Sequence, residues 1–176
     1  MKFHNTIYKS AIILTVSIFS LLCNSCFSVK YSATGATPPG KTFSIQYIEN
    51  QARIVEPGLS QQFTEALKDY IQSNSKSLVL VNGTGDNDFE AFITGYEPST
   101  PSTIVAGDVA AQNKFTVTVK VRYTCNVNPE LDFESSFSRY RMYSADSNFE
   151  TVKVELTEDI LEEILEDIYK RAFVNW

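Results

Sequence analysis

The sequence predicts an α+β domain in which two helices pack on one face of a mixed sheet of four to five strands. Residues 114–125 alternate strictly between polar and apolar side chains, which indicates a strand with one buried face. Residues 59–71 and 160–173 instead repeat apolar side chains at spacings of three and four, as amphipathic helices do. The predicted order is strand, helix, four strands and helix, so one helix crosses between the first two strands and hairpins join the rest.

The first half of the domain is predicted to contain two strands around one helix. Polar and apolar residues alternate over residues 42–48, which indicates a strand. A Pro-Gly pair at residues 57–58 precedes the helix, whose pattern ends near residues 73–74. The apolar face of this helix consists of Leu59, Phe63, Ala66, Leu67, Tyr70 and Ile71. The apolar run at residues 78–81 is predicted to be a short buried strand that ends in a turn.

The second half contributes three more strands. Residues 89–96 are predicted to form the first of them, and residues 97–112 form a long connection of a kind that is usually functional or disordered. In the strand at residues 114–125, the apolar face consists of Phe115, Val117, Val119, Val121, Tyr123 and Cys125. A turn at residues 128–129 returns the chain through residues 133–143, which we expect to pair with this strand as a hairpin.

The C-terminal segment predicts the second helix. Its apolar stripe consists of Ile160, Leu161, Ile164, Leu165, Ile168, Tyr169, Ala172 and Phe173. The acidic residues that lie away from this stripe are Glu158, Asp159, Glu162, Glu163, Glu166 and Asp167. We expect these acids to begin in the first turns, and Lys170 and Arg171 to lie in the last turn, because both placements complement the helix dipole. The acids are interpreted as a solvated helix face, not as a metal or acid-base site.

The N-terminus has the features of a bacterial export signal. Lys2 and Lys9 precede or border an apolar run at residues 11–23, which is shorter than the ~20 residues that a membrane span needs. Ser25 then precedes Cys26, and a small residue before a cysteine resembles the lipobox of bacterial lipoproteins. In such proteins the signal is cut before the cysteine, whose thiol is lipidated. The alternative is a plain secretory signal with an incidental cysteine.

Processing at this site defines the predicted domain organisation. Residues 1–25 are the signal peptide, residues 26–41 a lipidated tether, and residues 42–176 a single folded domain. Cleavage removes the one histidine of the chain, His4, which excludes catalytic triads and zinc sites that depend on histidine. Cys125 lies on an apolar strand face, so we expect a core residue and not a reactive thiol. With a net charge of −6, a nucleic-acid partner is not expected.

The candidate binding residues are basic. Lys120 and Arg122 share the polar face of the 114–125 strand with Lys114, and Arg139 and Arg141 lie in its hairpin partner. Arginine and lysine suit phosphate or sugar-acid oxygens, so these residues are a candidate anion-contact surface. The alternative is a polar sheet face whose cations pair with nearby acids such as Glu134. Plain alternation from Phe137 places Arg139 and Arg141 on the opposite face from Lys120 and Arg122, and a bulge near Ser138 would be needed to bring them onto one face.

Other motifs have simpler explanations. The Gly-x-Gly at residues 83–85 lacks the third glycine of a dinucleotide loop, and residues 86–88 lack the glycine that a calcium loop requires. Both are interpreted as turns, so we expect no metal and no cofactor. A carboxylate-dependent glycan hydrolase would use two of Glu90, Glu134 and Glu155, but their spacing does not indicate a pair.

Several stretches, in this order along the chain, resemble the LptE family of lipopolysaccharide-assembly lipoproteins. They are Cys26 with residues 29–35, and residues 42–47, 59–67, 137–140 and 172–176. The resemblance implies a non-enzymatic protein whose fold is two helices against a four-stranded sheet. It also implies an N-terminal lipid in the inner leaflet of the outer membrane and a position as a plug inside the β-barrel LptD, with which it inserts lipopolysaccharide into the outer leaflet.

The resemblance therefore implies two partners, an LptD-like barrel and lipopolysaccharide. The family is reported to bind lipopolysaccharide, and its anionic head suits the basic residues of this chain. We therefore take Lys120, Arg122, Arg139 and Arg141 as candidate lipopolysaccharide contacts, an inference from the residues and not from the family. The alternative function is a periplasm-facing carrier or chaperone for lipid or peptide, which would need an apolar pocket between the sheet and the helices.

Overall fold

The computed structural model describes residues 37–99 and 112–174. The predicted signal peptide, the lipidation site Cys26 and most of the tether and of the 97–112 connection lie outside the described residues. The elements, in chain order, are β1 (Thr42–Ile45), β2 (Glu49–Asn50), α2 (Leu59–Asn74), β3 (Val79–Leu80), β4 (Asn87–Ser99), β5 (Gln112–Cys125), η1 (Pro129–Leu131), β6 (Phe133–Ser144) and α3 (Phe149–Phe173).

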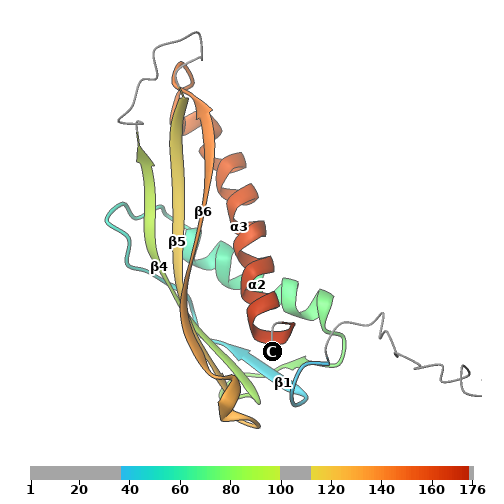
Figure 1. The fold of residues 1–176 in the computed structure, drawn as a ribbon. Coiled ribbons are helices and arrows are strands. Elements are labelled where there is room, and N and C mark those ends of the chain that lie inside the picture. The colour runs from blue at the N-terminus through green and yellow to red at the C-terminus, as the bar shows by residue number, and fades with distance from the viewer. Residues whose placement is uncertain (1–36, 100–111, 175–176) are drawn as a thin grey trace, which may run out of the picture. The chain divides into compact units, whose positions relative to one another are not determined.

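The strands form one mixed sheet, which confirms the predicted α+β class. Its order is β3-β1-β4-β5-β6, and β2 pairs with β4 beyond the end of β1. β1 runs parallel to β3 and β4, whereas β4, β5 and β6 form an antiparallel meander. Figure 1 shows α3 running along the meander and α2 crossing beside it. α3 contacts β5 and β6, and α2 contacts β1, β2 and β3.

The core lies between these helices and one face of the sheet. The predicted apolar face of β5 is confirmed, because none of its residues is more than 1% exposed, Cys125 included. The largest fully buried side chains include Phe43, Phe63, Phe89, Tyr96, Phe115, Tyr123 and Phe173. The predicted apolar faces of both helices also join this core. No helix within residues 37–99 and 112–174 is both long and apolar enough to cross a membrane.

The sheet has six strands, more than the predicted four to five, because the segment at residues 42–48 does not form one strand. β1 ends at Ile45, and β2 resumes pairing with β4 at Glu49. Between them, Ile48 is fully buried in the core and its N–H donates to Thr64 Oγ1 of α2, at 3.0 Å. This contact with a helix distant in sequence interrupts the strand.

The prediction of a buried strand at residues 78–81 was correct only in part. β3 covers two residues and lies at the edge of the sheet, beside β1. Leu78 points into the core, but Val79 is 61% exposed. Successive side chains of a strand point to opposite faces, so Leu78 and Leu80 face the core while Val79 between them faces outward.

The prediction that acids such as Glu158 and Asp159 open the C-terminal helix was wrong. α3 begins at Phe149, and the side chain of Asn148 accepts a hydrogen bond from the Glu150 N–H at 3.0 Å. Such a cap satisfies a free N–H of the first turn. The basic residues are in the last turn, as predicted.

A buried amide joins the entry of the chain to the centre of the sheet. Asn87, which is fully buried, donates from Nδ2 to the carbonyls of Pro39 and Thr42, at 2.7 and 3.0 Å. Its Oδ1 accepts from the Tyr123 hydroxyl at 2.6 Å. Burial raises the pKa of Tyr123 well above its ordinary value, so this hydroxyl stays protonated and donates. The network fixes where residues 39–42 meet β4 and β5.

We expect Asn87→Leu to lower the free energy of unfolding by about 3 kcal/mol, because it leaves a buried hydroxyl and two carbonyls without their partner. Tyr123→Phe removes one of these bonds and should cost about 1 kcal/mol. Urea unfolding followed by circular dichroism measures both. Equal stability of Asn87→Leu and the wild type would show that the amide network does not hold this end of the sheet.

Candidate functional site

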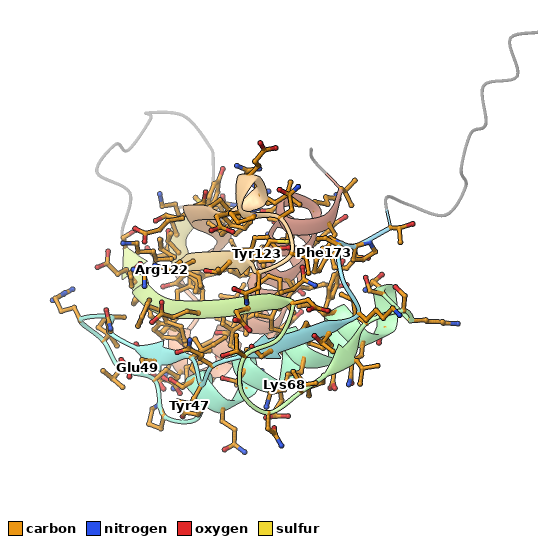
Figure 2. The ribbon with its side chains drawn as sticks, turned by 90° about the horizontal axis from the view of Figure 1, so that it is seen from below. Tyr47, Glu49, Lys68, Arg122, Tyr123 and Phe173 are labelled. Carbon is orange, nitrogen blue, oxygen red and sulfur yellow. The ribbon has the colours of Figure 1, made fainter. Side chains whose placement is uncertain are left out.

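The candidate surface is the face of β4, β5 and β6 that the helices do not cover. Lys120 and Arg122 project from β5 on this open face, opposite to the apolar residues of the same strand. Figure 2 shows Arg122 at the outside of the molecule, while its neighbour Tyr123 lies in the interior beside Phe173. The alternation along β5 therefore places both predicted cations in solvent.

Lys120 and Arg122 form an ion-pair cluster with Glu90 of β4 and Glu134 of β6, which we call the Arg122 cluster. The register sets Arg122 between the two acids. Arg122 lies 2.5 Å from Glu90 and 3.1 Å from Glu134, and Lys120 Nζ lies 2.6 Å from Glu134. Hydrogen bonds from Lys120 and Arg122 lower the pKa of Glu134, and Glu134 together with Glu90 raises the pKa of Arg122.

The Arg122 cluster is exposed and balanced in charge. The side chains of Lys120 and Arg122 are 44% and 54% exposed, so solvent and salt weaken these pairs. Two cations face two carboxylates. An anionic ligand at this position must therefore displace a carboxylate, which exposed pairs allow at small cost.

Arg139 and Arg141 lie on the other face of the sheet. They stand opposite Val117 and Phe115 of β5, and their side chains reach α3. Residue pairing between β5 and β6 is regular from Phe133 to Ser144, so no bulge near Ser138 joins the four candidates. The structure therefore brings Lys120 together with Arg122, and Arg139 with Arg141, but keeps the two pairs on opposite faces.

The arginines on β6 hold α3 against the sheet. Arg139 lies 2.6 Å from Asp167, and Arg141 lies 2.8 Å from Glu163 and 3.4 Å from Asp159. The hydrogen bond from Arg141 is the main reason why the pKa of Glu163 is lowered, and Glu163 in turn raises the pKa of Arg141. The contacts explain the position of these arginines without a ligand.

The open face also carries a cation that pairs with an aromatic ring. Lys114 Nζ lies 5.2 Å from the centre of the Tyr140 ring, within the range of a cation–π contact. Within the described residues Lys114 forms no salt bridge. Lys114 was predicted on this face and Tyr140 was not among the predicted residues, although plain alternation along β6 puts Tyr140 there as well. Tyr140 is 57% exposed and adds an aromatic surface to the polar sheet.

Hydroxyl groups occupy the middle of the open face between Lys114 and Lys120. Thr116 and Thr118 project from β5, and Thr118 Oγ1 lies 2.9 Å from Ser138 Oγ of β6. Hydroxyls and an aromatic ring flanked by cations suit contact with sugars and phosphates. The arrangement can bind such groups, but no described side chain on this face is placed as a nucleophile with an adjacent base.

The geometry is unfavourable for the carrier function. Large side chains fill the space between the sheet and the helices. A cavity of about 420 Å³ lies instead at the edge of β1, beside Lys68 of α2 and Asp88 of β4. Because polar groups contribute much of its lining, this cavity does not resemble a site for an acyl chain.

The geometry is also unfavourable for the glycan hydrolase. Glu90 and Glu134 both pair with Arg122, whereas Glu155 lies on α3. A general acid needs a raised pKa, but that of Glu134 is lowered. Residues 37–99 and 112–174 contain no group of three or more His, Cys, Asp or Glu side chains placed to hold a metal ion.

We expect Arg141→Ala to raise the pKa of Glu163 toward its usual value of 4.5, because Arg141 is the main cause of its depression. A carboxylate whose pKa is lowered by folding stabilises the fold at pH values above its ordinary pKa. This stabilisation disappears as the pH falls through the lowered pKa, so the variant, which lacks it, should lose less stability on acidification. Carbon NMR titration of Glu163 measures the shift. Arg139→Ala is the matched control and should move this pKa less; equal shifts would contradict the assignment.

Comparisons with known proteins agree with this fold. The LptE family, described as lipopolysaccharide-assembly, matches residues 40–172. None of the curated proteins matches the chain. A hypothetical protein from Chlamydia trachomatis is similar in structure, with a TM-score of 0.52 and 11% identity over 76% of this chain and 98% of its own.

Two further solved structures show the same arrangement. The uncharacterized lipoprotein B from Nitrosomonas europaea has a TM-score of 0.51 and 16% identity, over 74% of this chain and 81% of its own. A protein from Xanthomonas campestris has a TM-score of 0.51 and 6% identity, over 77% and 85%. At these identities the likeness concerns the fold alone. The family match, in contrast, spans nearly all of the described domain: this chain belongs to the LptE family of lipopolysaccharide-assembly lipoproteins, which is not a family of enzymes.

Proposed function

We propose that this protein is an outer-membrane lipoprotein that plugs and helps to assemble an LptD β-barrel, and that the pair inserts lipopolysaccharide into the outer leaflet. The observation that carries this proposal is the family match over residues 40–172. Lipidation at Cys26 would hold the protein at the periplasmic face of the membrane, because stable anchoring needs more than one acyl chain and a lipoprotein supplies them.

The surface of the domain suits a barrel lumen. The open face of the sheet is polar, and the outer side of α3 carries acids from Glu155 to Asp167. The lumen of large outer-membrane barrels is polar and water-filled, so a plug needs a hydrophilic exterior around its own apolar core. The described domain has such an exterior on both sides of its sheet.

We assign the lipopolysaccharide contact to Lys120 and Arg122, with Lys114 and Tyr140 farther along the same face. Phosphate groups are the strongest anionic partners that lipopolysaccharide offers to these cations. We propose that Arg139 and Arg141, which were also candidates, link β6 to α3 instead, because they already pair with acids of that helix.

The double variant Lys120→Ala with Arg122→Ala should weaken lipopolysaccharide binding in vitro by about tenfold, because two charge-assisted contacts are lost. The variant Glu134→Gln removes the acid that competes for both cations and should strengthen binding. Surface plasmon resonance on immobilised lipopolysaccharide measures both. Binding that is unchanged in the double variant would return these residues to the role of a polar sheet face.

Depletion of the protein should lower the lipopolysaccharide at the cell surface and leave the barrel misassembled. A C-terminally tagged protein, purified from detergent-solubilised outer membranes, should recover a large β-barrel at equal stoichiometry. Mass spectrometry of the recovered barrel and of the lipidated N-terminus identifies both. Normal barrel assembly after depletion, or recovery of the lipidated protein alone, would contradict the plug function.

A further inference from the structure

The outer edge of β6 carries a row of main-chain groups that no strand of the sheet uses. The Asn126 N–H donates to the Asp86 carbonyl at 2.8 Å, which continues the β4–β5 ladder. The N–H and C=O groups of one strand residue point to the same neighbouring strand, and successive residues alternate. Even-numbered residues of β5 therefore bond to β4, and odd-numbered residues bond to β6. The β5–β6 register then directs the N–H and C=O groups of the even-numbered β6 residues outward. Apart from Ser144, whose carbonyl accepts from Ser147 in the following turn, these residues are Glu134, Ser136, Ser138, Tyr140 and Met142.

The donors of this row are free throughout the described part of the chain. The Tyr140 carbonyl accepts from its neighbour Arg141 at 3.2 Å, but none of the five outward N–H groups has an acceptor within residues 37–99 and 112–174. β6 is the last strand of the sheet order. Its outer side thus offers unused hydrogen-bond donors along a strand of 12 residues.

The opposite edge of the meander is interrupted by a bulge and a proline or paired with other strands, whereas β6 is regular. The C-terminal part of β4 has a register shift between Ile93 and Gly95, and Pro98 in this part lacks an N–H group. The N-terminal part of β4, up to Ile93, pairs with β1 and β2. Bulges and prolines are the usual means by which proteins keep strand edges from recruiting other chains. β6 has neither a bulge nor a proline, so its main chain remains able to pair with another strand, although Glu134, Arg139 and Arg141 place charges along it.

A second copy of this chain is a poor occupant for electrostatic reasons. Two copies joined through β6 would share one sheet and place their α3 helices side by side on the same face. α3 carries eight acidic and three basic residues, so even with Arg139 and Arg141 of β6 this layer has a net charge of −3. The facing flanks would both be negative, and like charges repel.

We infer that the outer edge of β6 accepts, as an additional strand, an extended segment of the β-barrel partner that carries lysine or arginine beside α3. This inference rests on the proposed function, which supplies the barrel. Main-chain hydrogen bonds give affinity in this mode of recognition, and side chains of alternate residues give specificity. On the open face, Tyr140 and Met142 are exposed and offer apolar contacts to such a segment.

Residue-resolved amide exchange tests the inference without any substitution. In the full-length lipoprotein alone in detergent, the even-numbered amides of β6 should exchange fast and the odd-numbered ones slowly. In the co-purified complex with the barrel, the even-numbered amides should slow by at least about tenfold. Even-numbered amides that stay fast in the complex overturn the inference. Protection in the lipoprotein alone, with the mass of a dimer, overturns it in favour of a second copy.

Ser138→Pro tests the same edge by recovery of the barrel. The Ser138 N–H points outward, so proline blocks an incoming strand and removes no main-chain bond to β5, although it also removes the hydroxyl that contacts Thr118. We expect about tenfold lower recovery than with Ser138→Ala, which lacks the hydroxyl as well but keeps the N–H. Circular dichroism melting checks that both variants fold. Ser136→Pro is a second variant of the same kind, because the Ser136 N–H also points outward.

Different results would contradict the edge inference and the proposed function. Wild-type protein that recovers the barrel, together with equal recovery by the folded variants Ser138→Pro and Ser136→Pro, contradicts the edge inference alone. Wild-type protein that recovers no barrel contradicts the proposed function and this inference with it.

Discussion

The period-two alternation of β5 is the constraint on which the rest of the structure depends. Its buried residues, from Phe115 to Cys125, form the floor on which α3 packs, and they share one core with α2, so both helices lie on the same side of the sheet. The polar residues between them are left on an open face. Because a slip of one residue would exchange these faces, the register of the central strand is strongly specified. The pairing register with β5 then determines on which face of the sheet each charged residue of β4 and β6 lies.

This constraint separates two sets of charges that look alike in the sequence. On the open face, Lys120 and Arg122 meet acids of neighbouring strands, and all four groups are in contact with solvent. On the covered face, Arg139 and Arg141 meet acids of α3 at the rim of the core. Lys120 and Arg139 are equally exposed, with 44% of each side chain accessible, so the two sets differ in their partners and not in their exposure. The open-face cations pair within the sheet, whereas Arg139 and Arg141 link the sheet to α3.

The sequence predicted the elements whose signal is local, and it was wrong where distant contacts decide. The alternation of β5 and the apolar faces of α2 and α3 are confirmed, since each is visible within a dozen or so residues. The break after Ile45 depends on Ile48 and Thr64, which meet only in the fold. The start of α3 at Phe149 depends on the Asn148 cap and on packing of Phe149 against Phe115, with ring centres 5.0 Å apart. The alternation of side chains along each strand predicted on which face each basic residue lies. It could not predict the acids that pair with Arg139, because these lie on α3, whose position over β6 is set by the fold.

The long strands also separate the entry of the chain from the far end of the candidate surface. Asn87 and Asp86 bind the main chain of residues 39–42 where β4 meets the end of β5. Lys114 and Ser99 stand opposite one another toward the other end of the same ladder, eleven residues of β5 away from Cys125. At the usual rise of a strand this is about 35 Å. Lys114 and Tyr140 therefore lie far from the point where residues 39–42 enter the sheet. Because β4, β5 and β6 are joined by pairing along their length, a contact made at the far end is fixed relative to this entry point.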